Sequence, residues 1–521
     1  MFDHRNLRLR QRSYDGSGSR PRTRGVLCIA EVHNVPGVWS GRRAGGAAGA
    51  GGSVCTTVSE HATLIREPLQ CSWTAAEAIQ AIGGERLAFA LTGAWAGGGA
   101  IAGFDPLQVV CAADLGDGDP FAVLDRLPDV TGGDAAPSTA VGGGWFGWLG
   151  YRLAATVERV PLSSLRPVPM PELHLAYYDN VLRLDPDGQW WFEALATDAR
   201  RGELRARLRL LRRRLSGPAP AAPDAAPPPF TIDTRAAAQH VDAVAECRRR
   251  IAAGEIFQAN LCLRLDSIWD RGAAVLSATA LTRITPPYAA MFDTPVGSLA
   301  SLSPELFLRR RGDQIVTAPI KGTVKRVGDP AADAAALQRL RGSAKDAAEH
   351  VMIVDLMRND IGRVCEYGTV MAPRLPTAEA HPGLWHLVSR VSGTLRPGTS
   401  DAALLRATFP PGSVTGAPKV QSLRVIAELE RTAREVYTGS IGYCSPIAGL
   451  ELNVAIRTLE LRDGRLWIGA GGGIVADSDP HAELEEAIAK ARPIAAAVGA
   501  DVRVGGSDVA VRGRRHSIVA A

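Results

Sequence analysis

The sequence has no apolar run of the about 18 residues that a membrane-spanning helix needs, because glycine, proline or a charged residue interrupts each candidate run. It also has no large excess of one charge: 59 basic and 54 acidic residues leave a net charge of +5 over 521 residues. So mild a balance does not favour a nucleic-acid partner. We therefore expect a protein that binds neither membrane nor nucleic acid.

Motifs for zinc and for thiol redox chemistry are missing as well. The 8 cysteines form no C-x-x-C pair, and no H-E-x-x-H motif occurs. His381 and His386 lie in a segment with Pro and Gly that offers no further ligands at metal spacing. Scattered, reduced thiols are typical of a cytoplasmic protein. Hydrophobic residues make up 46% of the chain and charged residues 22%, which is typical of a folded globular protein.

The amino-terminal end differs in composition from the rest. Seven arginines fall within the first 24 residues, and residues 41–53 are almost entirely glycine and alanine. Without the apolar core of a secretory signal, residues 1–60 are expected to form a disordered leader. A nucleic-acid arm and an organelle transit segment are the alternatives. Residues 501–521 are expected to form a carboxy-terminal tail.

A Pro- and Ala-rich connection at 216–229 divides the remaining chain near its middle. Before it, residues 61–215 show short strand-like runs and end in a helix predicted over 197–215, where leucines recur on one face. After it, residues 230–500 alternate strand-like runs with helical patterns, and this order favours an α+β fold. Both halves can contribute strands to one sandwich. The helical patterns cover residues 236–253, 331–360, 419–434 and 481–497.

Two of these predicted helices carry paired carboxylates. Asp346 and Glu349 lie three residues apart and therefore share a helix face. Glu483, Glu486 and Lys490 share a face of the last helix, for which Ser478 or Asp479 can provide the cap. Oxygen ligands of this kind suit a hard cation such as Mg²⁺. The alternative is a pair of solvated helix faces.

Three further segments have residue types that bind or react. Lys321 in PIKGT is flanked by apolar residues, and a buried lysine loses its charge and becomes nucleophilic, although an exposed lysine is the commoner case. The runs GAGGGIV (469–475) and PGSVTGAPK (411–419) offer backbone N–H groups for an anion. Neither run matches a dinucleotide or phosphate-loop motif, so no nucleotide site is predicted.

Together these segments resemble the chorismate-utilising enzymes, and most of all their aminodeoxychorismate synthase component I branch. The match covers roughly residues 240–497, and residues 86–192 resemble the amino-terminal half of the family more loosely. The matching segments are IFQANLCLRL (256–265), SLSPELF (301–307), APIKGT (318–323), KDAAEHVMIVDLMRNDIGRV (345–364), HLVSRVSG (386–393), FPPGSVTGAPK (409–419), YTGSIGY (437–443), ELNVAIRT (451–458) and GGGIVADSDPHAELEEAIAKARP (471–493).

The resemblance implies an α+β fold in which two large antiparallel sheets pack as a sandwich with helices outside. It also implies a role for each residue at a matching position. The implied ligands of Mg²⁺ are Glu349 and Glu486, supported by Asp346 and Glu483. The implied substrate-binding groups are Arg457, Tyr437, Ser413, Lys490 and the backbone N–H groups of Gly471 and Gly473. The implied catalytic residues are Lys321, Glu305 as general acid, Gln258, and His386 beside the ring.

Two positions separate the branches of the family. An amide at Gln258 cannot deprotonate water, and this disfavours the branches that add water to chorismate. Lysine at position 321 favours the 4-amino product over anthranilate, because anthranilate synthases resemble this chain at Gln258 but have alanine where Lys321 stands. The resemblance therefore implies that Lys321 attacks chorismate and that ammonia then adds, which gives 4-amino-4-deoxychorismate. This product would serve 4-aminobenzoate synthesis, for folate or for another metabolite.

No glutaminase or lyase segment is recognisable in the chain. Ammonia would come from a separate glutamine amidotransferase subunit, and aromatisation would need a separate aminodeoxychorismate lyase. The sequence departs from the family after PIKGT, where Val324, Lys325 and Arg326 replace an Arg-Pro-Arg-like stretch. Anthranilate synthase component I chemistry and a silent, regulatory relative are the alternative functions.

Overall fold

The computed structural model describes residues 61–505 except 134, 163–164, 222–224, 327, 343, 374–375 and 382–383. The chain divides into two units, Met1–Cys55 and Thr56–Ala521, and every described residue belongs to the second unit. The predicted leader at 1–60 and residues 506–521 of the predicted tail lie outside the described residues.

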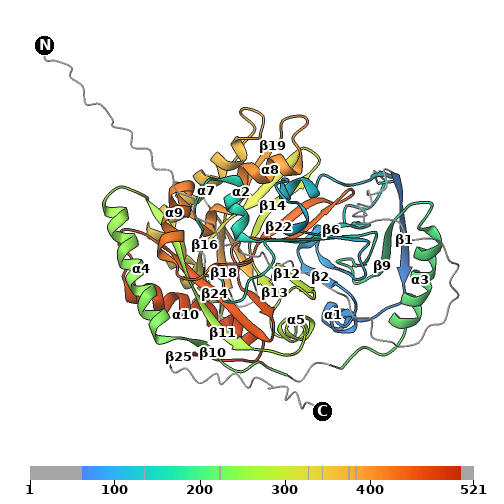
Figure 1. The fold of residues 1–521 in the computed structure, drawn as a ribbon, viewed down its shortest axis with the longest axis horizontal. Coiled ribbons are helices and arrows are strands. Elements are labelled where there is room, and N and C mark those ends of the chain that lie inside the picture. The colour runs from blue at the N-terminus through green and yellow to red at the C-terminus, as the bar shows by residue number, and fades with distance from the viewer. Residues whose placement is uncertain are drawn as a thin grey trace, which may run out of the picture. The chain divides into compact units, whose positions relative to one another are not determined.

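The larger sheet contains 14 strands and draws them from both halves of the sequence (Figure 1). Its pairings are antiparallel except at its two ends, where β1 pairs with β5 and β10 pairs with β25 in parallel. In spatial order the strands are β25 (Val502–Val504), β10 (Phe230–Ile232), β11 (Gln258–Ile268), β24 (Arg465–Ile474), β23 (Thr458–Arg462), β13 (Ser298–Ser303), β12 (Tyr288–Asp293), β2 (Ala88–Gly93), β3 (Gly99–Gly103), β8 (Asn180–Leu184), β9 (Trp190–Ala196), β1 (His61–Leu69) and β5 (Asp129–Thr131), and β20 (Gly416–Ala417) pairs with β11.

The second sheet contains 8 strands and a third, small sheet contains 3. The strands of the second sheet are β19 (Val391–Thr394), β15 (Gln314–Ala318), β14 (Leu306–Arg311), β22 (Gly449–Val454), β21 (Ser440–Ser445), β6 (Gly144–Leu149), β7 (Leu173–Tyr178) and β4 (Gln108–Cys111). The small sheet consists of β16 (Ile320–Lys325), β18 (Leu384–Val388) and β17 (Thr377–His381), and the sequence did not predict it.

Buried aromatic side chains from both large sheets form a shared core. Phe89 of the larger sheet stacks on Phe146 of the second sheet with ring centroids 4.2 Å apart. Trp148 and Tyr443 of the second sheet belong to the same cluster, as does Trp467 of the larger sheet. Inward-facing side chains of two sheets that interdigitate in this way define a sandwich. The predicted α+β fold with two large antiparallel sheets is confirmed.

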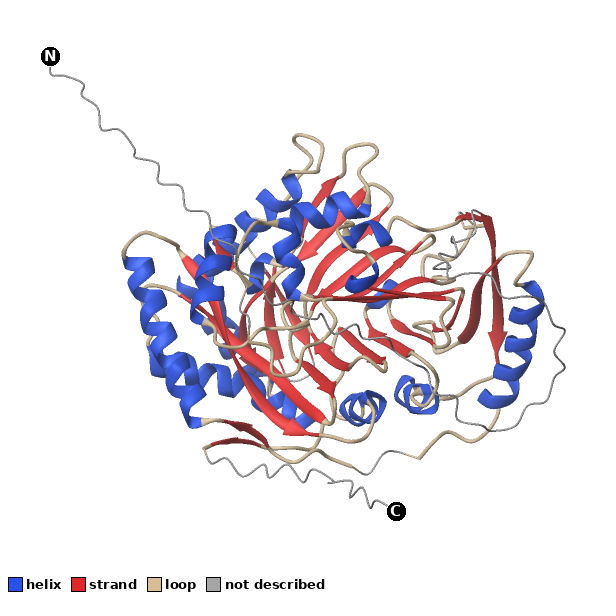
Figure 2. Ribbon diagram, viewed as in Figure 1, coloured by secondary structure: helices blue, strands red, loops and turns tan. Residues whose placement is uncertain are grey.

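The helices lie on the outer faces of the sheets (Figure 2). The last helix begins where its cap was predicted. The Asp479 carboxylate accepts hydrogen bonds from the N–H groups of His481 and Ala482, and Pro480 occupies the first turn. The helices are α1 (Ala75–Ile82), α2 (Ala154–Val157), α3 (Arg201–Leu215), α4 (Thr234–Ala252), α5 (Ala273–Leu281), α6 (Pro330–Arg341), α7 (Ala344–Gly362), α8 (Asp401–Thr408), α9 (Lys419–Leu429) and α10 (Pro480–Ala497).

Two helix predictions need correction. The single helix predicted over 331–360 is two helices, because α6 ends at Arg341 and α7 begins at Ala344. The helix predicted over 419–434 ends at Leu429, since Glu430 and Arg434 instead bind β11. Within the described ranges, no helix is long and apolar enough to span a membrane.

Candidate active site

Lys321 lies on β16 at a bulge. Its neighbour Gly322 has φ +75°, and the pairing of β16 with β18 shifts register between Lys321 and Thr323. A bulge with a left-handed glycine re-aims the side chains beside it. The Lys321 Nζ donates a hydrogen bond of 3.3 Å to the backbone carbonyl of Ser413. Burial lowers the pKa of Lys321, while the negative charges of Glu305 and Glu349 oppose that effect.

Glu305 is buried between β13 and β14, with 4% of its surface exposed. Burial raises the pKa of this carboxyl to about 7. A hydrogen bond from the Ser413 side chain and the charges of Lys321 and Arg457 act in the opposite direction. The structure therefore brings three predicted residues, Ser413, Lys321 and Arg457, close to the carboxyl of a fourth, Glu305, whose pKa lies near neutral pH.

One predicted substrate-binding residue lies on left-handed backbone, and a second lies next to such a position. Arg457 has φ +51°, and its carbonyl accepts a hydrogen bond of 2.9 Å from the N–H of Leu302. Tyr437 lies between Glu435 at φ +55° and Thr438 at φ +64°. Non-glycine residues adopt this conformation only where their surroundings enforce it, and such positions cluster at functional sites.

Glu460 of β23 supports the segment that carries Tyr437. Its carboxyl accepts hydrogen bonds from the N–H groups of Tyr437 at 2.9 Å and Val436 at 3.3 Å. Burial, together with the charge of Glu435, raises the pKa of Glu460 to about 8. Glu460 was not predicted from the sequence, because no local pattern relates it to the turn that contains Val436 and Tyr437.

The acidic residues of α10 surround Gly472 on β24. A side chain at this glycine would place its Cβ 3.0 Å from a carboxylate oxygen of Glu483, 3.5 Å from the Lys490 Nζ and 3.7 Å from Glu486. The Lys490 Nζ lies 2.7 Å from the Glu486 carboxylate and donates to the Gly471 carbonyl at 3.0 Å. Glu483 is buried and accepts a hydrogen bond of 2.6 Å from the Ser478 hydroxyl.

Glu349 of α7 lies near the same lysine, Lys321, as Glu486 of α10. The charges of Glu349 and Glu486 both act on Lys321, so the two carboxylates converge from different helices. The Asp346 side chain lies outside the described ones. In the described part of the chain, no three His, Cys, Asp or Glu side chains form a closed metal cluster. An open set of carboxylate oxygens nevertheless fits a hydrated Mg²⁺, which keeps several waters and shares its ligands with a substrate.

Gln258 is packed against the glycine-rich end of β24. Its side-chain amide lies so close to Gly473 that a Cβ there would be 1.9 Å from Nε2. Gln258 is 1% exposed, and its Oε1 has no hydrogen-bond partner. At Gly471 a Cβ would meet the Leu261 carbonyl at 2.1 Å. Both glycines are therefore required by close packing against β11, and an unpaired amide oxygen remains inside the sandwich.

His386 is buried on β18, where it is paired with Thr323 of β16. This pairing puts it one strand away from Lys321. Another buried histidine, His350 on α7, was not predicted: its Nε2 lies 2.6 Å from the Ser389 hydroxyl. Burial and the charge of Lys321 lower the pKa of His350. The signal for His350 was present in the sequence, because it follows Glu349 directly.

A charged network on β11 was also missed. Arg434 is buried, and its five donors bind Glu430 twice, the carbonyls of Val414 and Asn260, and the Thr438 hydroxyl. Glu430 in turn accepts the N–H of Cys262 at 2.8 Å. The polar residues Gln258, Asn260, Cys262 and Arg264 alternate along β11, and this period of two was the signal that could have revealed the network.

Comparison with known proteins identifies the group to which this arrangement belongs. The profile of the chorismate binding enzymes matches residues 99–496. Aminodeoxychorismate synthase component 1 of Klebsiella aerogenes is 38% identical over 364 residues, which cover 68% of this chain and 76% of that protein. An anthranilate synthase component I-like protein of Synechocystis sp. is 36% identical over 359 residues, which cover 68% and 73% of the two chains.

Solved structures of chorismate-using enzymes share the fold of this chain. Anthranilate synthase component I from Streptococcus pneumoniae superimposes with a TM-score of 0.66 and 25% identity, covering 87% of this chain and 95% of that one. The menaquinone-specific isochorismate synthase MenF from Escherichia coli shares the fold, with a TM-score of 0.64, 18% identity, and coverage of 84% and 95%. With the predicted residues on this fold, the chain is a member of the chorismate-binding enzyme family.

Proposed function

We propose that this chorismate-using enzyme is an aminodeoxychorismate synthase component I, which converts chorismate and ammonia to 4-amino-4-deoxychorismate. The observation that carries the proposal is the pairing of two groups with altered pKa values. Lys321 is made easier to deprotonate by burial, and Glu305, with a pKa of about 7, is available as an acid. A nucleophile and an acid with these properties are what replacement of the 4-hydroxyl requires. The relatives of that name support the proposal.

In the proposed reaction, neutral Lys321 attacks C2 of chorismate through Nζ while the C4 hydroxyl departs and the ring double bond shifts. Glu305 gives its proton to the departing hydroxyl, which leaves as water. Ammonia then adds at C4, the double bond shifts back, and the lysine leaves from C2. The net change is the replacement of a hydroxyl by an amino group, with release of water.

Other residues of the chain position the substrate. Arg457 and Tyr437 would bind the enolpyruvyl carboxylate, aided by Ser413 and by the N–H groups of Gly471 and Gly473. His386 would lie beside the substrate ring. Gln258 would occupy the position from which a base could activate water, and its amide cannot do so. Glu349 and Glu486, supported by Asp346 and Glu483, would hold Mg²⁺, and Lys490 would balance their charge. The ion would supply positive charge to the ring carboxylate.

The proposed reaction needs two other proteins. Ammonia would be delivered by a glutamine amidotransferase subunit, and a separate aminodeoxychorismate lyase would convert the product to 4-aminobenzoate, for folate or another metabolite. We place the reaction in the cytoplasm. All cysteines among the described residues are free thiols, which supports a reducing compartment: Cys71, Cys111, Cys247, Cys262, Cys365 and Cys444.

Anthranilate synthase component I is the second candidate, because relatives named for that activity also match the chain. The two reactions give different products from the same substrates. Purified protein should be incubated with chorismate, Mg²⁺ and an ammonium salt, with and without aminodeoxychorismate lyase, and the products identified by mass. We expect 4-aminobenzoate only when the lyase is present. Anthranilate and pyruvate formed without the lyase would assign the protein to the second reaction.

A further inference from the structure

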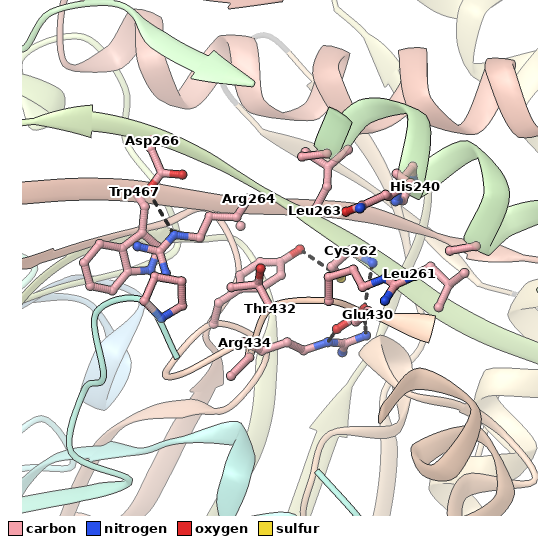
Figure 3. A pocket seen from close by; sticks show the side chains of 18 of the residues that line it. His240, Leu261, Cys262, Leu263, Arg264, Asp266, Glu430, Thr432, Arg434 and Trp467 are labelled. Atoms are coloured by element: carbon pink, nitrogen blue, oxygen red, sulfur yellow. Dashed lines mark hydrogen bonds and ion pairs between the residues drawn. The ribbon is translucent and has the colours of Figure 1, made fainter. Parts of the chain in front are cut away.

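A cavity of about 170 Å³ lies at the edge of β11, apart from the residues around Lys321 (Figure 3). Side chains of β11, β24 and α4 line it together with the segment 429–434. Among the residues predicted to bind substrate, Tyr437 alone reaches its wall. Apart from Tyr437, the reaction proposed above uses none of the residues that line this cavity.

Two polar side chains in this cavity have no partner for some of their buried atoms. Arg264 donates from Nε to Asp266 at 3.2 Å, but its Nη1 and Nη2 atoms are buried and without a hydrogen bond. His240 is 5% exposed, and its Nε2 is also unpaired. A buried polar group without a hydrogen-bond partner destabilises the fold. Their presence in one cavity therefore indicates an occupant that supplies the missing partners.

The charges around the cavity favour an anion. Four arginines and two carboxylates line it: Arg264, Arg431, Arg434 and Arg465 with Asp266 and Glu430.

Both carboxylates are already engaged. Asp266 contacts both Arg264 and Arg465, the latter at 3.5 Å, and Glu430 is paired with Arg434 at 2.7 Å. All five donors of Arg434 are used within the protein, whereas Arg264 keeps the two terminal nitrogens of its guanidinium. Two parallel N–H groups of this kind match the two oxygens of a carboxylate.

The rest of the cavity sets the size and shape of the ligand. The Arg264 guanidinium lies over the Trp467 ring, 4.1 Å from its centroid, and this contact stabilises its position. Leu261, Leu263 and Pro167 provide apolar walls. A cavity of roughly 150 Å³ holds one benzene molecule. There is consequently room for one ring and a carboxylate.

From these observations we infer that the cavity binds a small aromatic carboxylate of benzoate size, whose carboxylate contacts Arg264 and whose far edge contacts His240. A hydroxyl on the ring edge would pair with the His240 Nε2. This imidazole is neutral at pH 7, because burial lowers its pKa to about 4. The inference rests on the cavity and does not depend on the proposed reaction.

Calorimetric titration of the full chain with benzoate, without chorismate or Mg²⁺, tests the inference. We expect one molecule to bind per chain, and binding to weaken by about tenfold or more in Arg264→Met, since the hydrogen bonds lost are charge-assisted. The matched control is Arg465→Met, which removes a cation that contacts the same Asp266 and should change the affinity less than about threefold. No binding to the wild type, or equal binding to Arg264→Met, would overturn the inference.

Two further titrations distinguish binding in this cavity from binding at the substrate site. Binding should persist in Arg457→Met, whereas loss of binding in that variant but not in Arg264→Met would move benzoate to the substrate site and refute the inference. 4-Hydroxybenzoate should bind more tightly than benzoate to the wild type, and His240→Phe should abolish this preference. The His240 arm does not require Arg264→Met to fold, and a preference that survives in His240→Phe would count against the inference.

Discussion

The Lys321 ammonium lies 3.3 Å from the backbone carbonyl of Ser413, on a segment 92 residues further along the chain. The side chain of the same Ser413 is hydrogen-bonded to Glu305. One residue therefore contacts both the proposed nucleophile and the proposed acid. This relationship makes Ser413 the point at which their protonation states can be altered experimentally.

Replacement of Lys321 by Ala should lower chorismate turnover by roughly 1,000-fold or more, since the proposed nucleophile is removed. Initial rates of 4-aminobenzoate formation in the coupled lyase assay measure the loss. Arg326→Ala is the matched control, because it removes an exposed cation that directly follows the same strand. Wild-type rates in Lys321→Ala would remove this lysine from the mechanism.

The pH dependence of turnover should have a limb near pH 7, because Glu305 has a pKa of about 7 and must be protonated to act as an acid. Lys321 must be neutral, and burial favours this form by lowering its pKa. The Ser413 hydrogen bond lowers the pKa of Glu305, so Ser413→Ala should raise that pKa and move the limb near pH 7 to higher pH. Profiles of kcat/KM would reveal the shift. Ser413→Thr keeps a hydroxyl and should retain the wild-type limb, and identical profiles in all three proteins would contradict the assignment.

Removal of divalent ions with a chelator should abolish turnover, and Mg²⁺ should restore it. In Glu486→Gln, half-maximal activity should need about tenfold more Mg²⁺ or more, because one charged ligand becomes neutral. Glu485→Gln is the control: it is an exposed neighbour on the same helix and should behave as the wild type. A requirement for Mg²⁺ that is unchanged in Glu486→Gln would argue against this ligand.

Adjacent glycines of β24 should respond differently to alanine. In Gly473→Ala the new Cβ would fall 1.9 Å from the Gln258 amide, so this buried side chain must move, and kcat/KM for chorismate should drop roughly 10- to 100-fold. In Gly472→Ala the nearest atom is 3.0 Å away, at the end of the Glu483 side chain. That variant should keep most of its kcat/KM at saturating Mg²⁺ but need more of the ion. Equal losses at saturating Mg²⁺ would be inconsistent with this arrangement.

Glu460 should make the protein less stable as the pH rises. Its pKa is about 8 in the folded state against 4.5 ordinarily, so the folded protein holds a proton that the unfolded chain releases between these values. The free energy of unfolding should fall by up to about 1.4 kcal/mol per pH unit across this window. Thermal midpoints of Glu460→Gln should fall less steeply between pH 5 and 8 than those of the wild type. Parallel curves would show that Glu460 does not titrate in this way.

Local patterns in the sequence predicted much of the fold. The cap and the extent of α10 depend on neighbouring residues, and this helix was anticipated. The contacts of Lys321 with Ser413, and of Glu460 with the Tyr437 backbone, each join a strand residue to a residue in a separate, non-strand segment. No local pattern encodes such contacts. The left-handed backbone at Arg457 was equally inaccessible, because arginine has no preference for it. The types of the residues were enough to predict which groups react or bind. Their pKa shifts could not be predicted, because these depend on contacts that only the tertiary structure creates.

The pairing of β11 with β24 has a consequence for biosynthesis. These strands are hydrogen-bonded from Ala259–Ile474 to Ile268–Arg465, yet β24 leaves the ribosome well after β11. At about 5–20 residues per second, tens of seconds separate the two strands. Throughout that interval the β24-facing edge of β11 lacks its final partner, and an unpaired edge is a template for aggregation. Synthesis at lower temperature or with chaperones should therefore increase the yield of folded protein, and truncation before β24 should leave the chain insoluble.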